Sequence, residues 1–145
     1  MVRLATGDHP NFRVDGRETV RAGPSYAVDT VEDLKRELPH AELVYLMGAD
    51  AYVDIATWHR AETFVRSATV VVVPRPGSAL AALDRLDEPF RSAATRLDLV
   101  PCGMSSTLLR ERVRQGRSLR YLTPDPVARY LRERSLYAQH PWEAS

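Results

Sequence analysis

Apolar positions along this chain form two patterns. One has the spacing of a helix, and the other is the continuous run of a buried strand. Apolar residues three and four positions apart predict a helix over residues 25–38, which Pro39 ends. The continuous apolar run at 43–47 predicts a strand that is covered on both faces, and residues 69–73 give the clearest strand pattern in the chain. Because helical and strand patterns follow one another in turn, the sequence predicts an α/β fold with a parallel sheet.

The remaining pattern is weaker but continues the same alternation. It predicts short strands at 12–14 and 97–100, helices at 61–67 and 106–115, and a terminal helix that begins at residues 124–126. No internal repeat, low-complexity tract or linker interrupts the chain. We therefore predict one domain over residues 1–145.

Three of these segments are followed by residues that carry chemistry. Gly48-Ala49-Asp50 follows one strand, Pro74-Arg75-Pro76-Gly77 the next, and Gly103-Met104-Ser105-Ser106-Thr107 the last. The carboxyl ends of parallel strands meet at one edge of a sheet, where α/β proteins bind their ligands. An acid, an arginine and a hydroxyl-rich helix start at such an edge favour a nucleotide site.

The hydroxyl-rich segment is the strongest single candidate. A helix start has unpartnered N–H groups and a partial positive charge, so Ser105, Ser106 and Thr107 with Arg110 one turn later could hold an anion. An ordinary N-cap with an additional serine explains the same residues. The segment alone does not decide between these two interpretations.

Composition excludes several classes of function. The 145 residues are 44% hydrophobic and 27% charged with a formal net charge of +1, so no overall field favours nucleic acid or an anionic membrane. One cysteine excludes an internal disulfide and fits a reducing compartment. No apolar stretch has the length of a membrane span, and no signal peptide begins the chain, so we expect a cytoplasmic protein.

The motifs in their order resemble those of bacterial nicotinate mononucleotide adenylyltransferases. They are Ser25-Tyr26-Ala27-Val28-Asp29-Thr30, Met47-Gly48-Ala49-Asp50, Thr57-Trp58-His59-Arg60, Val73-Pro74-Arg75-Pro76-Gly77 and Met104-Ser105-Ser106-Thr107-Leu108-Leu109-Arg110. The resemblance implies a Rossmann-like nucleotidyltransferase fold. It also implies transfer of AMP from ATP to nicotinate mononucleotide, which gives nicotinate adenine dinucleotide and pyrophosphate in NAD biosynthesis, with Mg²⁺ assisting. It leaves open whether the protein is a homo-oligomer and whether it prefers nicotinate or nicotinamide mononucleotide.

The resemblance also implies roles for individual residues. The ATP side would consist of Gly48, Asp50, Ser105, Ser106, Thr107 and Arg110, and the pyridine-nucleotide side of Tyr26, Thr30, Trp58 and Arg75. Asp50 would accept from ribose hydroxyls, with a plain helix cap as the alternative. Trp58 would stack on the pyridine ring, whereas a tryptophan without the motif is more often part of the core. No residue of this chain inherits a catalytic or metal-binding role.

One family motif is absent. The family opens with Gly-Gly-Thr-Phe-Asp-Pro-x-His-x-Gly-His, whose histidines stabilise charge in the transition state, and none of the four histidines here stands in such a motif. We expect that at least one leading βαβ unit is missing, so that the chain alone is poorly stable and nearly inactive. The DNA upstream of Met1 tests whether a start codon is misplaced. The alternatives are a non-catalytic nucleotide-binding fragment or partner subunit, and a related adenylyltransferase such as the phosphopantetheine one.

Overall fold

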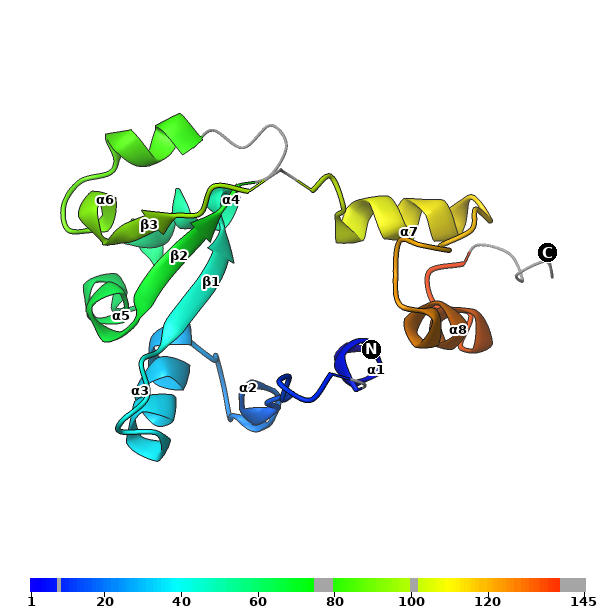
Figure 1. The fold of residues 1–145 in the computed structure, drawn as a ribbon, viewed down its shortest axis with the longest axis horizontal. Helices are drawn as coiled ribbons and strands as arrows, with labels where there is room; N and C mark the ends of the chain where they lie inside the picture. Colours follow the sequence, from blue (N-terminus) through cyan, green and yellow to red (C-terminus); the bar gives the residue numbers. More distant parts are fainter. Residues whose placement is uncertain (8, 75–79, 100–101, 139–145) are drawn as a thin grey trace. The chain divides into compact units, whose positions relative to one another are not determined.

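The structure, a computed structural model, describes the chain except residues 8, 75–79, 100–101 and 139–145. It divides into two compact units (Figure 1). The sheet unit is Gly16–Gly103, and the helical unit combines Met1–Asp15 with Met104–Ser145. The single domain expected over residues 1–145 stays a prediction.

The sheet unit contains a three-stranded parallel sheet, whose arrows run side by side in Figure 1. Its strands are β1 (Val44–Gly48), β2 (Thr69–Val73) and β3 (Ala94–Arg96), in the order β1-β2-β3. Gly48 is paired with Val73, so β1 and β2 end at the same level. The prediction of an α/β fold with a parallel sheet is confirmed.

Short helices connect the strands of the sheet unit. They are α2 (Arg17–Val20), α3 (Ala27–Glu37), α4 (Ala49–Tyr52), the 3₁₀ turn η1 (Ile55–Thr57), α5 (Ala61–Ser67), the 3₁₀ turn η2 (Leu80–Arg85) and α6 (Phe90–Ala93). Strand side chains alternate between faces, and one face places Val70 and Val72 in a core with Tyr52 and Phe64. Burial of this apolar surface is the main stabilising contribution to the unit.

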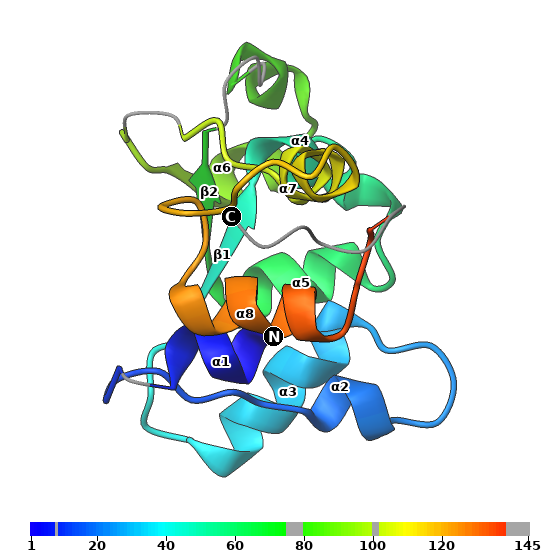
Figure 2. The same ribbon diagram turned by 90° about the vertical axis from the view of Figure 1, so that its right-hand side faces the viewer.

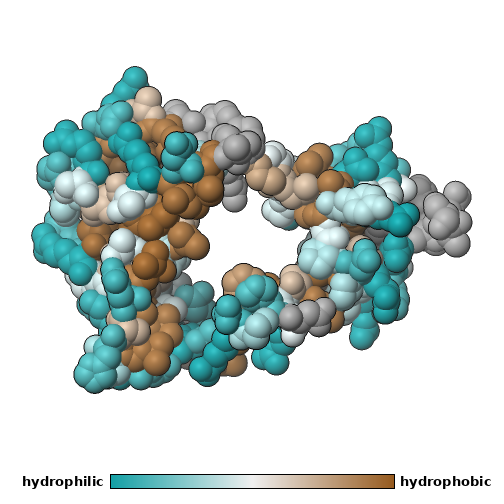
Figure 3. Space-filling model, viewed as in Figure 1, coloured by the Kyte–Doolittle hydropathy of each residue, from teal (hydrophilic) through white to brown (hydrophobic). Residues whose placement is uncertain are grey.

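The alternate positions of β1 point to the opposite face of the sheet and are much less covered. Val44 is 53% exposed and Leu46 is 66% exposed, whereas Met47 between Leu46 and Gly48 is 8% exposed. Figure 3 shows apolar side chains gathered in the region of the strands. The sequence pattern predicted a strand buried on both faces, and in β1 only one face is buried.

The described residues of the helical unit form three helices and a smaller core. The helices are α1 (Val2–Thr6), α7 (Ser106–Arg114) and α8 (Asp125–Glu133), and α1 lies beside α8 (Figure 2). The buried core residues are Val113, Leu119, Val127, Ala128 and Leu131. Within the described residues, no helix is long and apolar enough to cross a membrane.

Two expected strands differ from the structure. Residues 12–14 form no strand, and the described sheet consists of β1, β2 and β3. The strand expected at 97–100 lies earlier, at β3, and Leu97 N–H still donates to Val72 O at 3.0 Å. Pairing with β2 fixes the position of β3, and the local apolar pattern carries no information about that register.

Candidate functional site

The carboxyl edge of the sheet holds the first group of predicted residues. Gly48 ends β1 and is the N-cap of α4, and Asp50 lies exposed in the first turn of that helix. Pro74 follows β2 directly, and the strand pairing places it next to the end of β1. β1 and β2 therefore end at one edge of the sheet, and the expectation that the loops after all three strands line this edge stays a prediction. Arg75 lies outside the described residues, so its role stays a prediction.

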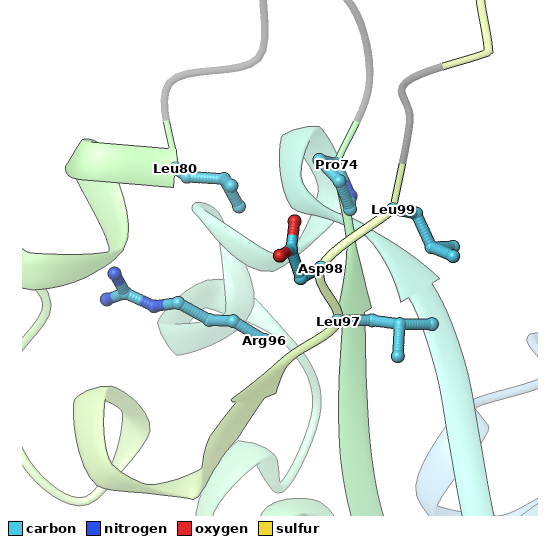
Figure 4. Close-up of a pocket in the computed structure, with 6 residues that line it drawn as sticks. All are labelled: Pro74, Leu80, Arg96, Leu97, Asp98 and Leu99. Carbon is cyan, nitrogen blue, oxygen red and sulfur yellow. The ribbon is translucent and has the colours of Figure 1, made fainter.

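A cavity of about 410 Å³ lies at this edge (Figure 4). The residues that line it are Pro74, Leu80, Arg96, Leu97, Asp98 and Leu99. Figure 4 shows Leu97 and Leu99 on one side of the extended segment and Arg96 on the other. Its volume lies within the range of small-ligand pockets, about 300–1,000 Å³. Sequence reasoning missed this cavity, because it interpreted Leu97 to Leu99 as part of a strand.

Arg96, which lines that cavity, forms an ion pair with Asp84. Its guanidinium donates to Asp84 Oδ1, twelve residues earlier in η2. The hydrogen bond and charge of Arg96 lower the pKa of the Asp84 carboxyl below its ordinary value. Nothing in the sequence pattern indicated this pair, since the two residues meet only through the fold.

An aromatic group in the sheet unit contains two of the predicted pyridine-side residues. The Tyr26 ring at the start of α3 stacks on His59, with ring centroids 4.1 Å apart and an interplanar angle of 25°. Trp58, directly before His59, is half-buried and tilts against Phe64 at a centroid distance of 5.6 Å. The structure thus brings the start of α3 to the segment before α5. Sequence reasoning gave His59 no role, although its place inside the Trp58 motif was a signal.

Thr30, the third of these residues, lies in a polar network around Arg21. The Arg21 guanidinium donates to Ser25 Oγ at 2.6 Å, to Thr30 Oγ1 at 3.1 Å and to Asp33 Oδ2 at 2.8 Å. Thr30 Oγ1 in turn donates to Glu18 Oε1 at 2.6 Å. Loss of water raises the pKa of Asp33, but hydrogen bonds from two arginines outweigh it and leave the pKa below its ordinary value. This network fixes the segment before α3 onto the helix, and the sequence gave no indication of it.

In the helical unit, the start of α7 contains the residues that the family resemblance assigns to the phosphates of ATP. Ser105 is the N-cap, and its Oγ accepts from Leu108 N–H at 3.1 Å. Ser106 and Thr107 are exposed on the first turn, and Arg110 Nη2 donates to Thr107 Oγ1 at 3.3 Å. The capping interpretation therefore holds for Ser105. It leaves the other two hydroxyls on the surface of the helix start, where an anion would bind.

Comparisons with known proteins indicate the family of this chain. A scan against protein-family models gives no match. Proteins named probable nicotinate-nucleotide adenylyltransferase are similar over nearly the whole chain. The one from Geobacter metallireducens is 37% identical over 155 residues, which covers 94% of this chain and 72% of the relative. The one from Thermus thermophilus is 39% identical over 137 residues, covering 94% of this chain and 70% of the relative.

Solved structures agree on the fold. The Plasmodium falciparum nicotinic acid mononucleotide adenylyltransferase complexed with APC matches with a TM-score of 0.60 at 16% identity. The match covers 80% of this chain, and this chain spans 60% of that one. A structure of the same enzyme with NaAD matches equally well, with 58% of its chain covered. At this identity the likeness shows a Rossmann-like nucleotidyltransferase fold. With the sequence identities above, it follows that this chain belongs to the nicotinate-nucleotide adenylyltransferase family.

Proposed function

We propose that this protein acts in NAD biosynthesis as a nicotinate-nucleotide adenylyltransferase, joining the AMP part of ATP to nicotinate mononucleotide with release of pyrophosphate. The observation that carries the proposal is the identity of 37–39% over 94% of the chain to relatives with that name. The reaction is a direct attack of one phosphate on another. It therefore depends on positioning and charge stabilisation more than on a covalent intermediate.

The aromatic group of the sheet unit suits the pyridine nucleotide. A flat pyridinium ring binds well against an aromatic face, and the Trp58 indole is held half-buried by Phe64. We propose that Trp58 stacks on this ring and that Tyr26, Thr30 and Arg75 line the same pocket. The stack of Tyr26 on His59 supports the proposal, because it joins the two segments that would form the pocket walls.

The start of α7 suits the phosphates of ATP. Its exposed Ser106 and Thr107 hydroxyls lie at the positive end of a nine-residue helix, and Arg110 adds a guanidinium one turn later. We propose that these groups, with the Ser105 cap holding the turn in shape, bind phosphate oxygens. Gly48 and Asp50, at the sheet edge, would take the adenosine part.

We propose that Mg²⁺ binds to this protein together with ATP. Among the described residues there is no group of three or more His, Cys, Asp or Glu side chains that could hold a metal ion. A Mg²⁺ ion bound mainly by phosphate oxygens and water requires no such group. We therefore treat the magnesium complex of ATP as the substrate, and we propose a cytoplasmic site of action.

The 145 residues contain no His-x-Gly-His motif, to which the family resemblance assigns charge stabilisation in the transition state. We therefore expect these residues by themselves to bind both nucleotides with little or no release of pyrophosphate. A nucleotide-binding partner subunit is the second candidate. A test for pyrophosphate release after addition of a chain that supplies the histidines distinguishes the two.

Binding of nicotinate mononucleotide tests the proposal directly. The chain has two tryptophans, so a Trp142→Phe background makes the emission report on Trp58. We expect nicotinate mononucleotide to quench this emission, and phosphopantetheine to have no effect. Trp58→Ala, followed by calorimetry, should weaken nicotinate mononucleotide binding at least tenfold while ATP binding stays within about twofold.

Trp58→Phe serves as the matched control, because it keeps an aromatic face and the contact with Phe64. It should lose less affinity for the pyridine nucleotide than Trp58→Ala. Equal losses for ATP and nicotinate mononucleotide in Trp58→Ala would contradict the stacking role. Binding of phosphopantetheine in preference to nicotinate mononucleotide would favour the related adenylyltransferase instead.

A further inference from the structure

Two segments far apart in the sequence meet at the aromatic group of the sheet unit. Tyr26 begins α3, and Trp58–His59 lie between η1 and α5. Their rings touch in the Tyr26–His59 stack, but both rings are exposed, so stacking alone holds the segments weakly. A second contact between the same segments is therefore of interest.

Arg60 provides that contact. It follows His59 directly and has a left-handed backbone, with φ 50° and ψ 43°, at the N-cap of α5. Its carbonyl accepts from Phe64 N–H at 3.0 Å, which anchors the residue to the first turn of the helix. Non-glycine residues rarely adopt this conformation, and it is retained where surrounding contacts hold it.

The Arg60 side chain reaches across to α3. Nη1 donates to Glu32 Oε2 at 3.1 Å and Nη2 donates to Oε1 of the same carboxylate, a bidentate pair. Nη1 also lies 3.5 Å from Asp29 Oδ1, one turn nearer the helix start. The hydrogen bond and charge of Glu32 raise the pKa of Arg60. Bidentate pairs fix orientation as well as distance, so Arg60 sets how α3 faces the Trp58–His59 segment.

We propose that Arg60 is a positioning residue for the pyridine-nucleotide pocket. This inference rests on the proposed function. Through its ion pairs with Glu32 and Asp29, Arg60 holds the start of α3 at the distance and angle from Trp58 that the nucleotide requires. Its contribution to affinity comes from preorganisation, since walls already in place need not be ordered when the ligand binds.

An ordinary surface ion pair is the competing explanation. Arg60 is 43% exposed and Glu32 is 38% exposed, so the pair adds little to stability. The chain offers a matched control in the same helix. Arg66 pairs with Glu62 at 2.9 Å, with exposed fractions of 68% and 59%, and this pair lies within α5 and joins no second segment.

The experiment compares Arg60→Asn with Arg66→Asn in the Trp142→Phe background. Asparagine tolerates the left-handed backbone, so Arg60→Asn removes the pair without adding strain. We expect Arg60→Asn to raise the Kd for nicotinate mononucleotide about fivefold, with ATP affinity and melting temperature nearly unchanged. Without ligand, acrylamide should quench Trp58 more strongly in Arg60→Asn than in the parent. Arg66→Asn should change neither measurement.

A double variant tests whether Arg60 acts through its partner. Glu32→Gln should weaken binding but no more than Arg60→Asn does, since Arg60 keeps its ion pair with Asp29, and the two changes together should cost no more than Arg60→Asn alone. Unchanged binding in Arg60→Asn, together with a loss in Trp58→Ala, would overturn this inference and leave the proposed function standing. Absence of nicotinate mononucleotide binding in the parent would overturn both. A fall in melting temperature that accounts for the whole loss of affinity would reduce Arg60 to a structural role.

Discussion

The residues proposed to bind the pyridine nucleotide (the pyridine side) and those proposed to bind the phosphates of ATP (the phosphate side) are held in place in different ways. On the pyridine side, Tyr26, Thr30 and Trp58 are held by partners up to 33 residues away in sequence, as in the contact of Tyr26 with His59. On the phosphate side, Ser105 and Thr107 are held by residues three positions along the same helix. The pyridine side therefore depends on tertiary packing, and the phosphate side depends on one helix start. Mutations should affect the two sides through different forces.

The largest expected effect is a loss of folding stability when Phe64, which packs against Trp58, is replaced. Phe64 is fully buried, meets Tyr45 edge-on at a centroid distance of 4.9 Å and supports Trp58. Phe64→Ala should lower the free energy of unfolding by about 3–5 kcal/mol, because it removes buried apolar surface and leaves a cavity. Chemical denaturation measures this loss. Phe64→Leu should lose clearly less, and equal losses would contradict a packing origin.

The next effect concerns the network before α3. Arg21 donates to three side chains and is 21% exposed, with its partner Asp33 at 30%. Arg21→Gln should lower the melting temperature by less than Phe64→Ala does, because it removes hydrogen bonds and an ion pair that solvent partly screens. Arg36→Gln is the control, since Arg36 reaches the other oxygen of Asp33 but is 77% exposed. A larger loss in Arg36→Gln would contradict the account.

A smaller effect is expected at the start of α7. Ser105→Ala removes the bond from Leu108 N–H and should destabilise the helical unit by about 1 kcal/mol. Ser105→Asp keeps an acceptor at the cap and should restore the loss. Ser106→Ala should leave stability unchanged and weaken only ATP binding. Hydrogen exchange of α7 amides separates these outcomes, and equal protection in all three variants would contradict the capping role.

The smallest effect is a dependence on pH. Because the folded pKa of Asp33 lies below its ordinary value of 3.8, the ionised carboxylate stabilises the fold above that pH. That stability is lost as the pH falls below 3.8 and through the folded pKa. An Asp33→Asn variant should therefore show a weaker acid dependence of its melting temperature. An unchanged acid dependence would show that other carboxylates account for it.

The elements that were predicted correctly from the sequence are those that local residue patterns determine. The helix at 61–67 and the strand at 69–73 match the structure, because periodicity acts over a few residues. It missed the position of β3, the open face of β1 and the Arg21 network, since each depends on which segments pack together. The binding roles expected for all the candidate site residues stay predictions.

One measurement tests the central claim that the sheet unit forms a pyridine-nucleotide pocket around Tyr26 and Trp58. Nuclear magnetic resonance of the labelled chain, titrated with nicotinate mononucleotide, reports which amide and indole groups respond. The account predicts shifts at the Trp58 indole, at His59 and in the first turn of α3, with little change in the core around Val72. Shifts confined to other parts of the chain, or no shifts at saturating nucleotide, would contradict it.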